Sequence, residues 1–535
     1  MFAKNAVLFA QKGFKLKPEY QLKCGLEIHT QLSTMKKLFS HSKNDPFMAI
    51  STPNSNISMF DVSMPGTQPI FNYETLLFGL KLAAYLKCKD INFSSKFDRK
   101  HYFYQDNPQG YQLTQKFDPL AQNGSLKLIS AIDGVFKDKN IRISTIQLEQ
   151  DTGKSLVRLG ESNDQTKGLI EIDLNRNNVP LIELVTEPDF ESVDEVKAFL
   201  QKYQKIVRFL GICRGDMEQG TLRCDVNVNV NDHCLVELKN LPTTSSITHA
   251  IQYEYMRQID NLENGYKGIK ETRNWDGEKT VSIREKNVAV DYRFMPDNEL
   301  KPLKISQKLV EQVEKSIPFD LDSEVLKLIN EPFKLSLLNS NKLLDKDEND
   351  GIFILDYYKT MANKYLYSYH QGNSNIQLLN NIFFNDILVN IAKIPNLSFK
   401  EFTELFSHES VLDLVNLINT GNFITRPNAE LLLNFALSSK LKNPDWVLFV
   451  EENGLSKISL QSLTQEQQDE IYRKITESFD PTILSAIYKK PHAEKKKKDE
   501  QKFEKGLNVA IKTALELTNN RIDPLDLRKI IINHL

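Results

Sequence analysis

In three short segments of this sequence, a carboxylate stands two positions from an imidazole, a second carboxylate or a guanidinium group. The pairs are Glu27 with His29, Glu149 with Asp151, and Arg223 with Asp225. Successive side chains of a β-strand point to opposite faces, so each pair shares one face if its segment is extended. Carboxylates with one imidazole suit a hard divalent cation such as Mg²⁺, which keeps waters and bridges to phosphate oxygens. Taken singly, each pair is also typical of a strand face in contact with water.

Glu183 raises a related question, because it stands in the middle of the apolar run from Val179 to Val185. A buried carboxylate is costly unless it is paired or bound to a metal. This segment therefore predicts either a fourth acidic group at the same site or an edge strand with Glu183 facing water. The sequence alone does not show whether the four segments meet.

Basic and aromatic residues occur together in the segment Lys96 to Gln115. They are Arg99, Lys100, His101, Tyr102, Phe103, Tyr104 and Tyr111. A nucleotide or an RNA end is held by such a combination, through charge pairing with phosphates and stacking on bases. The alternative is a loop whose aromatic rings fill the core.

The stretch IQLEQDTGKS, from Ile146 to Ser155, ends like a phosphate-binding P-loop. A P-loop requires a glycine five residues before its Gly-Lys pair, and that position is Leu148. The P-loop is therefore excluded, and a strand followed by a turn from Asp151 to Lys154 is expected. No Ser-His-Asp order, Ser-Ser-Lys amidase pattern or G-x-G-x-x-G motif is evident, so the chain does not resemble a hydrolase that makes its own ammonia.

Strands and helices can be expected from the same periodicities. Thr221 to Val230 alternates apolar and polar residues, and a helix is predicted from Ser192, with Glu195 completing a capping box and Gly211 as its stop. After about Lys301 the patterns become helical. They end in a predicted helix hairpin with a turn at Asn519-Asn520, and Lys489 to Lys505 reads as a solvated linker.

Bulk properties limit the class of protein. A chain of 535 residues predicts roughly three to four domains. Its net charge of -2 gives no general bias toward nucleic acid, and five cysteines without a C-x-x-C pair argue for a reducing compartment. No apolar run is long enough to span a membrane, so integral membrane insertion is not expected. Lys4, Lys12, Lys15 and Lys17 precede the first acid, which predicts a transit peptide or a disordered start.

A set of long motifs in order closely resembles the B subunit of the aspartyl/glutamyl-tRNA amidotransferase, the GatB family. The likeness is dense from about Gln21 to Leu300 and weaker beyond, where the end of the chain resembles the YqeY proteins. The motifs are GLEIHTQL from Gly25, MPGTQP from Met64, KFDRKHYFYQDNPQGYQLTQ from Lys96, LEQDTGKS from Leu148, DLNRNNVPLIELVTEPDF from Asp173, GTLRCDVNVNV from Gly220, VELKNL from Val236, ETR at Glu271 and DYRFMP from Asp291.

The resemblance implies an ATP- and Mg²⁺-dependent carbon–nitrogen ligase acting on glutamate misattached to tRNA(Gln). The side-chain carboxylate is phosphorylated, and ammonia from an amidase-like A subunit displaces the phosphate to give Gln-tRNA(Gln). A small third subunit and a mitochondrial matrix location are expected. The implied fold is α+β: a leader (1–20), a mainly antiparallel catalytic cradle (21–300), a helical domain (301–395) and a YqeY-like tail that contacts tRNA (396–535).

The resemblance also suggests roles for particular residues. The expected magnesium ligands, direct or through water, are Glu27, His29, Glu149 and Asp225, with Glu183 and Glu218 as further candidates. Glu149, Arg223 and Lys239 are the expected catalytic residues. The candidates for substrate or nucleotide contact are Arg99, Tyr104, Arg176 and Asn227, and those for tRNA contact in the tail are Lys495, Lys496, Lys497 and Lys498.

This chain departs from the family pattern at Gln150 and Gln219, where a second acid is common. If Ile146 to Asp151 is a strand, Gln150 turns to the face of Leu148, away from Glu149; if the chain already turns there, a ligand is missing. A tRNA-binding scaffold without catalysis is therefore one alternative function. Another is a stand-alone ligase that uses free ammonia and a free amino acid.

Overall fold

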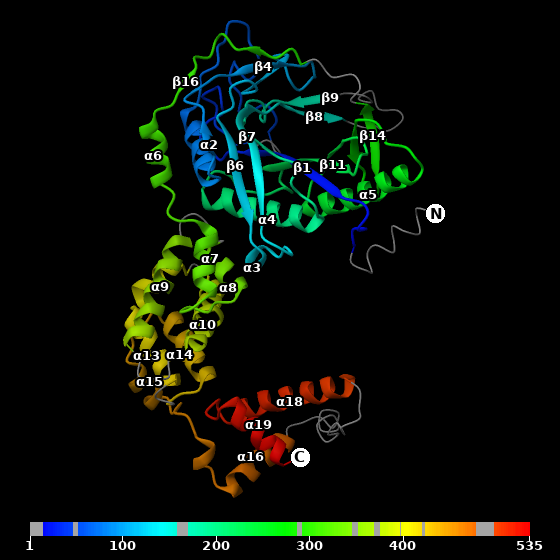
Figure 1. The fold of residues 1–535 in the computed structure, drawn as a ribbon. Coiled ribbons are helices and arrows are strands. Elements are labelled where there is room, and N and C mark those ends of the chain that lie inside the picture. Colours follow the sequence, from blue (N-terminus) through cyan, green and yellow to red (C-terminus); the bar gives the residue numbers. More distant parts are fainter. Residues whose placement is uncertain are drawn as a thin grey trace, which may run out of the picture. The chain divides into compact units, whose positions relative to one another are not determined.

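The structure is a computed structural model that divides into two compact units, Met1–Leu326 and Lys327–Leu535. Both units are drawn in Figure 1. The residues described are 14–45, 52–157, 170–285, 292–344, 351–368, 375–395, 397–419, 423–477 and 497–534.

The first unit is built around a nine-stranded sheet that is antiparallel except where β12 pairs with β13. This arrangement confirms the expected mixed fold with a large, mainly antiparallel sheet. In spatial order the strands are β14 (Thr280–Glu285), β13 (Glu271–Trp275), β12 (Val236–Lys239), β11 (Leu222–Val230), β1 (Leu22–Gln31), β10 (Pro180–Thr186), β7 (Lys139–Gln150), β6 (Ala121–Leu128) and β2 (Asp90–Ile91).

The predicted alternation of β11 is confirmed, because Leu222, Val226 and Val230 are buried while Arg223 and Asp225 are half-buried. The strand β10 lies between β1 and β7. The edge-strand alternative for Glu183 is therefore wrong, and this carboxylate lies inside the sheet. The continuous apolar run around it follows from burial of both faces.

Helices cover the apolar face of the sheet. α4 (Val193–Phe209) packs against β6 and α5 (Thr244–Glu263), α5 packs against β11, and α2 (Tyr73–Tyr85) packs against β7 (Figure 1). Ser192 caps α4 as predicted, and Gly211 follows its end with a positive φ. The capping box is only half formed, because the Glu195 carboxylate accepts from the backbone N–H of Glu191 and pairs with Lys139 instead.

Shorter elements complete the first unit. They are β3 (Ser94–Ser95), β4 (Asp98–His101), β5 (Tyr111–Thr114), α3 (Ser130–Asp133), β8 (Lys154–Val157), β9 (Ile170–Asp173), β15 (Met295–Pro296), β16 (Leu303–Lys304), α6 (Gln307–Lys315) and α7 (Leu321–Ile329), the last of which runs into the second unit. The small sheet β15-β4-β5 carries the basic and aromatic segment.

The start of the described chain is ordered. The Lys17 backbone N–H donates to the Tyr255 hydroxyl at 3.0 Å, and the Phe14 and Tyr255 rings meet edge to face. This part of the chain therefore contacts α5, and the leader expected over residues 1–20 stays a prediction. Lys4 and Lys12 lie outside the described residues.

The described part of the second unit contains helices and no named strand, as the sequence pattern predicted. They are α8 (Leu337–Leu344), α9 (Gly351–Ser368), α10 (Ile376–Asn381), the π-helix η2 (Ile382–Ile387), α11 (Leu388–Lys393), α12 (Phe399–Leu405), α13 (His408–Asn419), α14 (Arg426–Ser438), α15 (Trp446–Glu452), η3 (Leu460–Ser462), α16 (Gln465–Glu477), α18 (Lys497–Leu517) and α19 (Pro524–Asn533).

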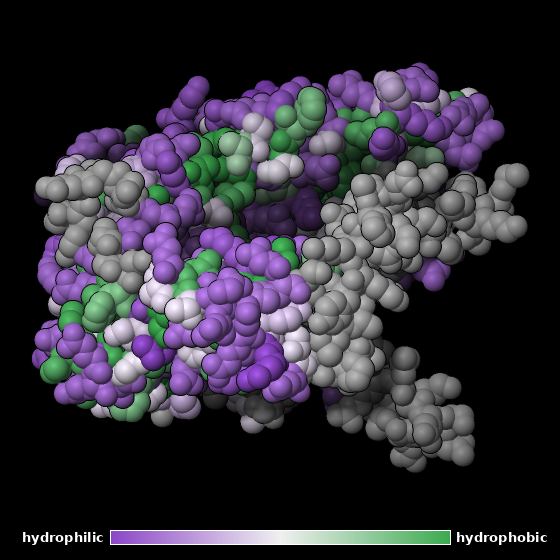
Figure 2. Space-filling model, turned by 90° about the horizontal axis from the view of Figure 1, so that it is seen from below, coloured by the Kyte–Doolittle hydropathy of each residue, from purple (hydrophilic) through white to green (hydrophobic). Residues whose placement is uncertain are grey.

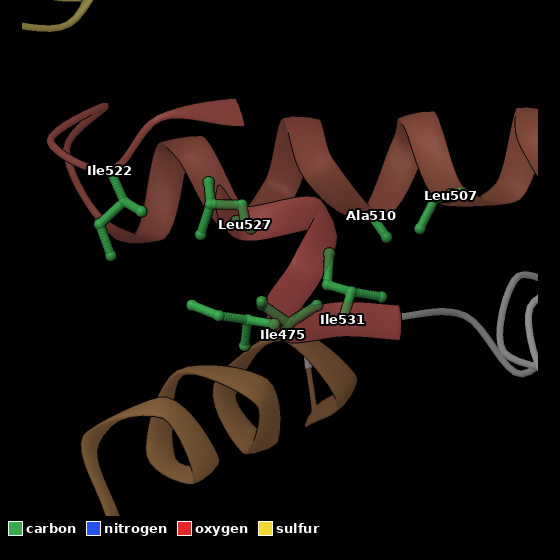
Figure 3. Packing of buried hydrophobic residues seen from close by; sticks show 8 residues of the cluster. Ile475, Leu507, Ala510, Ile522, Leu527 and Ile531 are labelled. Carbon is green, nitrogen blue, oxygen red and sulfur yellow. The ribbon is translucent and has the colours of Figure 1, made fainter. Parts of the chain in front are cut away.

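Three helices near the end of the chain share a hydrophobic cluster, in which Ile475 of α16, Leu507 of α18 and Leu527 of α19 are buried (Figure 3). The predicted hairpin is confirmed: Asn519 and Asn520 have positive φ in its turn, and Asp523 caps α19. The predicted linker is wrong from Lys497 onward, because α18 begins there. Residues 478–496 lie outside the described part.

Figure 2 shows one face, on which hydrophobic residues form only small groups among polar ones. Among the helices of the described segments, none combines the length and the apolar character needed to cross a lipid bilayer.

Candidate functional site

The four acidic segments meet on the face of the sheet opposite the helices. The strands β7, β10, β1 and β11 are consecutive neighbours. Their register sets His29 opposite both Glu183 and Arg223, and sets Glu27 opposite Asp225. Residues directly opposite each other in antiparallel strands share a face. The convergence that the sequence left open is therefore a consequence of strand order and register.

At the centre of this face the carboxylates surround one imidazole. His29 Nε2 lies 3.4 Å from Glu149 Oε1 and 3.8 Å from Glu183 Oε2. One ligand atom each from Glu27, His29 and Glu183 lies within 4.8 Å of the others. Glu149 is only 3% exposed, and its Oε2 has no hydrogen-bond partner among the described residues. A buried carboxylate oxygen without a donor is costly, so this atom is suited to accept a cation.

The charges of this group shift one another's pKa. Burial disfavours the charged imidazole, but the carboxylates of Glu149, Glu183 and Glu27 outweigh it and raise the pKa of His29 to about 9. Burial and the charge of Glu149 raise the pKa of Glu183. Burial also opposes ionisation of Glu149, but Lys100 and His29 lower its pKa. These pKa shifts arise because several carboxylates lie close together with few cations to compensate their negative charge.

This group forms part of the wall of an open cleft of about 480 Å³. Its other walls carry cations and aromatic rings in addition to the acids. The lining residues are Glu27, Lys100, Thr114, Lys116, Gln147, Glu149, Glu183, Glu237, Lys239, Lys270, Arg284, Glu285, Tyr292 and Phe294.

Lys100 lines the cleft, although the roles suggested from the sequence went to its neighbour Arg99. It lies on β4, and its ammonium nitrogen stands 5.4 Å from the centre of the Tyr292 ring. Burial lowers the pKa of Lys100, but Glu149, Glu183 and Glu27 outweigh it and raise that pKa. The sequence places both lysine and arginine in the basic and aromatic segment. Because neighbouring side chains of a strand point to opposite faces, Lys100 and Arg99 of β4 lie on different sides, and this alternation is the signal that distinguishes them.

Asp225 is paired with Lys239 rather than grouped with the central imidazole. Lys239 Nζ lies 2.5 Å from Asp225 Oδ2 and 3.5 Å from Glu237 Oε1. The Thr272 hydroxyl donates to Glu237 Oε2 at 2.8 Å and orients that carboxylate. Asp225 therefore lies beside the central group with its charge already compensated, while Lys239 lines the cleft.

Two arginines lie near the turn that follows the end of β7. Arg223 donates to Asp151 Oδ2 at 2.8 Å, and Arg176 Nε donates to the Thr152 carbonyl at 2.9 Å. Gly153 accepts a further hydrogen bond from Arg176. These two guanidinium groups are half-exposed and hold the turn after β7, outside the lining of the cleft.

Other predicted site residues lie outside the lining of the cleft. Arg99 is engaged with Asp297, at 2.6 Å, and with Glu299. Tyr104 is on an exposed loop, and Glu218 is exposed in the turn before β11. Asn227 faces the cleft side of β11 without lining it.

The predicted tail lysines are described only in part. Lys495 and Lys496 lie outside the described residues, and Lys497 and Lys498 belong to the first turn of α18.

The departure at Gln150 leaves the acidic group intact. β7 extends through Gln150, so strand parity turns its side chain away from Glu149. Gln150 Oε1 accepts from the Leu113 backbone N–H at 3.1 Å, and its Nε2 donates to Gln109. Gln112 instead supports Glu149, donating to Oε1 at 2.8 Å. Gln150 thus fixes the approach of β5 to β7.

These features define a class of protein: one with a mainly antiparallel sheet whose open face gathers carboxylates, the ligands that hard divalent cations prefer, beside lysines, which are groups of a kind that pairs with phosphate. Residues 22–311 match the family described as the GatB/GatE catalytic domain. The chain belongs to this family.

Several curated relatives are similar over most of their length, and each is named as the B subunit of a mitochondrial glutamyl-tRNA(Gln) amidotransferase. The protein of Zygosaccharomyces rouxii is 43% identical over 476 residues, covering 86% of each chain. That of Eremothecium gossypii is 43% identical over 470 residues, covering 84% of this chain and 85% of its own. That of Candida glabrata is 39% identical over 548 residues, covering 97% and 95%.

Proposed function

We propose that this chain is the B subunit of a mitochondrial glutamyl-tRNA(Gln) amidotransferase. It phosphorylates the side-chain carboxylate of glutamate on misacylated tRNA(Gln) with ATP, and ammonia then replaces the phosphate. The names and coverage of the relatives support this function. The single observation that carries the chemistry is the buried acidic group, with its orphan Glu149 oxygen, facing lysines across one cleft.

The residues present fit a magnesium ion. Glu27, Glu183 and the free oxygen of Glu149 are hard oxygen ligands, and His29 is a further ligand, direct or through water. When bound, the ion offsets negative charge on the transferring phosphoryl group. Asp225 is a more distant contributor, because Lys239 already compensates its charge.

The lysines of the cleft serve the phosphoryl group and the substrate carboxylate. Lys100 and Lys239 are held cationic by the neighbouring carboxylates, and the cations Lys270 and Arg284 line the same cleft. Ammonium and guanidinium groups orient oxyanions by charge-assisted hydrogen bonds. A carboxylate is a poor electrophile until one oxygen becomes a phosphate leaving group, so positioning these two anions together is the chemical task of the cleft.

Partners follow from the same function. The ammonia comes from an amidase-like A subunit, a small third subunit completes the complex, and the work is done in the mitochondrial matrix. We further propose the division of the chain into a cradle (21–300), a helical domain (301–395) and a YqeY-like tail (396–535) that contacts the tRNA body. The lysines from Lys495 to Lys498 would contribute to a salt-dependent affinity for tRNA.

Replacement of Glu149 tests the function and the metal site together. In the assembled complex supplied with free ammonia, Glu149→Ala is expected to abolish Gln-tRNA(Gln) formation while tRNA binding persists. Glu263→Ala, which removes an exposed acid of α5 outside the central group and the cleft, is the matched control and should retain most activity. Formation of product by Glu149→Ala at the wild-type rate would contradict the metal assignment.

The wild-type complex separates this function from its rivals. ATP turnover should require both charged tRNA and magnesium, titrated separately. Stable tRNA binding without such turnover would identify a scaffold instead, and amide formation without any tRNA would identify a stand-alone ligase.

A further inference from the structure

A row of aromatic rings leads from the cleft to the surface. Phe294 and Tyr292 line the cleft, with ring centres 6.0 Å apart. Tyr292 is followed by Tyr102 at 6.4 Å, and Tyr102 by Tyr104 at 5.3 Å. The row therefore connects the wall of the cleft with a loop outside it, which spans residues 102–110.

This loop is tied down at both ends and in its middle. The Tyr102 N–H donates to the Gly110 carbonyl at 3.1 Å, and the Gly153 N–H donates to the Asp106 carbonyl at 2.8 Å. Gln109 accepts from Gln150 Nε2 at 3.0 Å. The backbone that carries the two rings between these bonds is therefore fixed before any ligand arrives.

The two rings at the outer end face water. Phe103 is 87% exposed and Tyr104 is 62% exposed. Phe103 lies over Gly110, where an added Cβ would come within 2.9 Å of its ring, so the ring is supported from below without being covered. Exposed rings on a fixed backbone lose little conformational entropy on binding, which favours stacking with another flat group.

We propose that Phe103 and Tyr104 form a stacking platform for the unpaired 3′ end of the charged tRNA. This inference rests on the proposed function. The amino acid is esterified to the terminal ribose, so with its carboxylate in the cleft this ribose lies within the length of one glutamyl group, and the preceding unpaired nucleotides extend outward past the rim. Single-stranded bases stack on aromatic side chains at such places.

ATP is the less suitable occupant of this platform. A small ligand buries most of its surface in its pocket, so its base belongs with rings that line the cleft, such as Tyr292 and Phe294. Phe103 and Tyr104 do not line the cleft. They are accessible to a ligand of which only a part enters the cleft, as is the case for a tRNA.

The experiment compares Phe103→Ala and Tyr104→Ala in the assembled complex, measuring KM for Glu-tRNA(Gln) and for ATP, together with equilibrium binding of Glu-tRNA(Gln). Each variant is expected to weaken tRNA binding and raise its KM by roughly 5- to 100-fold, the range of one base–aromatic stack. The KM for ATP should stay unchanged, and Tyr104→Phe should restore the wild-type values. Phe136→Ala removes a fully exposed ring between α3 and β7 and is the control.

Two results would overturn the platform: unchanged tRNA binding in both variants, or a raised KM for ATP in place of tRNA. Failure of the wild-type complex to form Gln-tRNA(Gln) would instead refute the proposed function. The binding measurement needs no turnover, so the platform is decided even in that case.

Discussion

At the residue scale, the sequence DTGKS illustrates how one glycine can be required for packing rather than for phosphate binding. Gly153 follows the end of β7, and its N–H donates to the Asp106 carbonyl. A Cβ placed there would lie 2.9 Å from that carbonyl oxygen and 2.9 Å from Leu174 Cδ2. The glycine allows two chain segments to pass close to each other beside the site.

Gly153→Ala is therefore expected to destabilise the chain by about 1–3 kcal/mol, because backbone atoms on one side cannot move away easily. Urea unfolding of the full chain measures the change. Gly25→Ala is the matched control, since the nearest atom to an added Cβ is 3.6 Å away, an ordinary contact. Equal loss of stability in both variants would show that the close approach is not the cause.

At the element scale, the ETR motif joins two strands to a helix. Glu254 of α5 is fully buried and accepts from both Arg257 and Thr280. Arg273 of β13 donates to Glu271 at 2.8 Å and lies near Glu254. This network holds β13 and β14 against α5, and Arg284 of β14 lines the cleft.

Glu254→Ala should cost about 3–5 kcal/mol, because it removes the fully buried carboxylate that is the main counter-charge of the half-buried Arg257. Unfolding by urea, followed through the signal of Trp275 on β13, would report it. Glu263→Ala on the same helix breaks an exposed ion pair with Lys17 and an exposed hydrogen bond from the Tyr20 hydroxyl, and should cost about 0–1 kcal/mol. A loss confined to that lower range for Glu254→Ala would mean that the network adds little stability.

At the scale of the whole molecule, the chain is divided into two compact units. The acidic group and the cleft belong entirely to the first unit. The cluster around Leu527 belongs entirely to the second. A ligand that binds one folded unit stabilises that unit by mass action.

Magnesium should therefore protect the first unit from proteolysis, and Leu527→Ala should expose the second. Deleting a buried leucine costs about 2–5 kcal/mol. Limited digestion with fragments identified by mass spectrometry, with and without Mg²⁺, separates the two effects. Leu525→Ala, on the exposed side of α19, is the control. Loss of magnesium protection in Leu527→Ala would show that the units are coupled.

Much of the fold was accessible from local pattern. The alternation of β11, the cap of α4, the turn at Asn519-Asn520 and the change to helices after the sheet all depend on neighbours in the sequence, and these expectations hold. The motifs also identified the family. Local preferences are decided within a few residues, so the sequence alone determines them.

The site itself depended on long-range pairing, which local pattern does not specify. Strand order and register brought Glu27, Glu183 and Glu149 around His29, and parity on β4 turned Lys100 toward them. Gln150 was ambiguous until β7 was seen to continue through it. The sequence by itself determined the chemical groups, the local elements and the family. Only the tertiary structure decided which groups share a cleft, because residues far apart in the chain meet there only when the strands have paired in the order and register of the complete sheet.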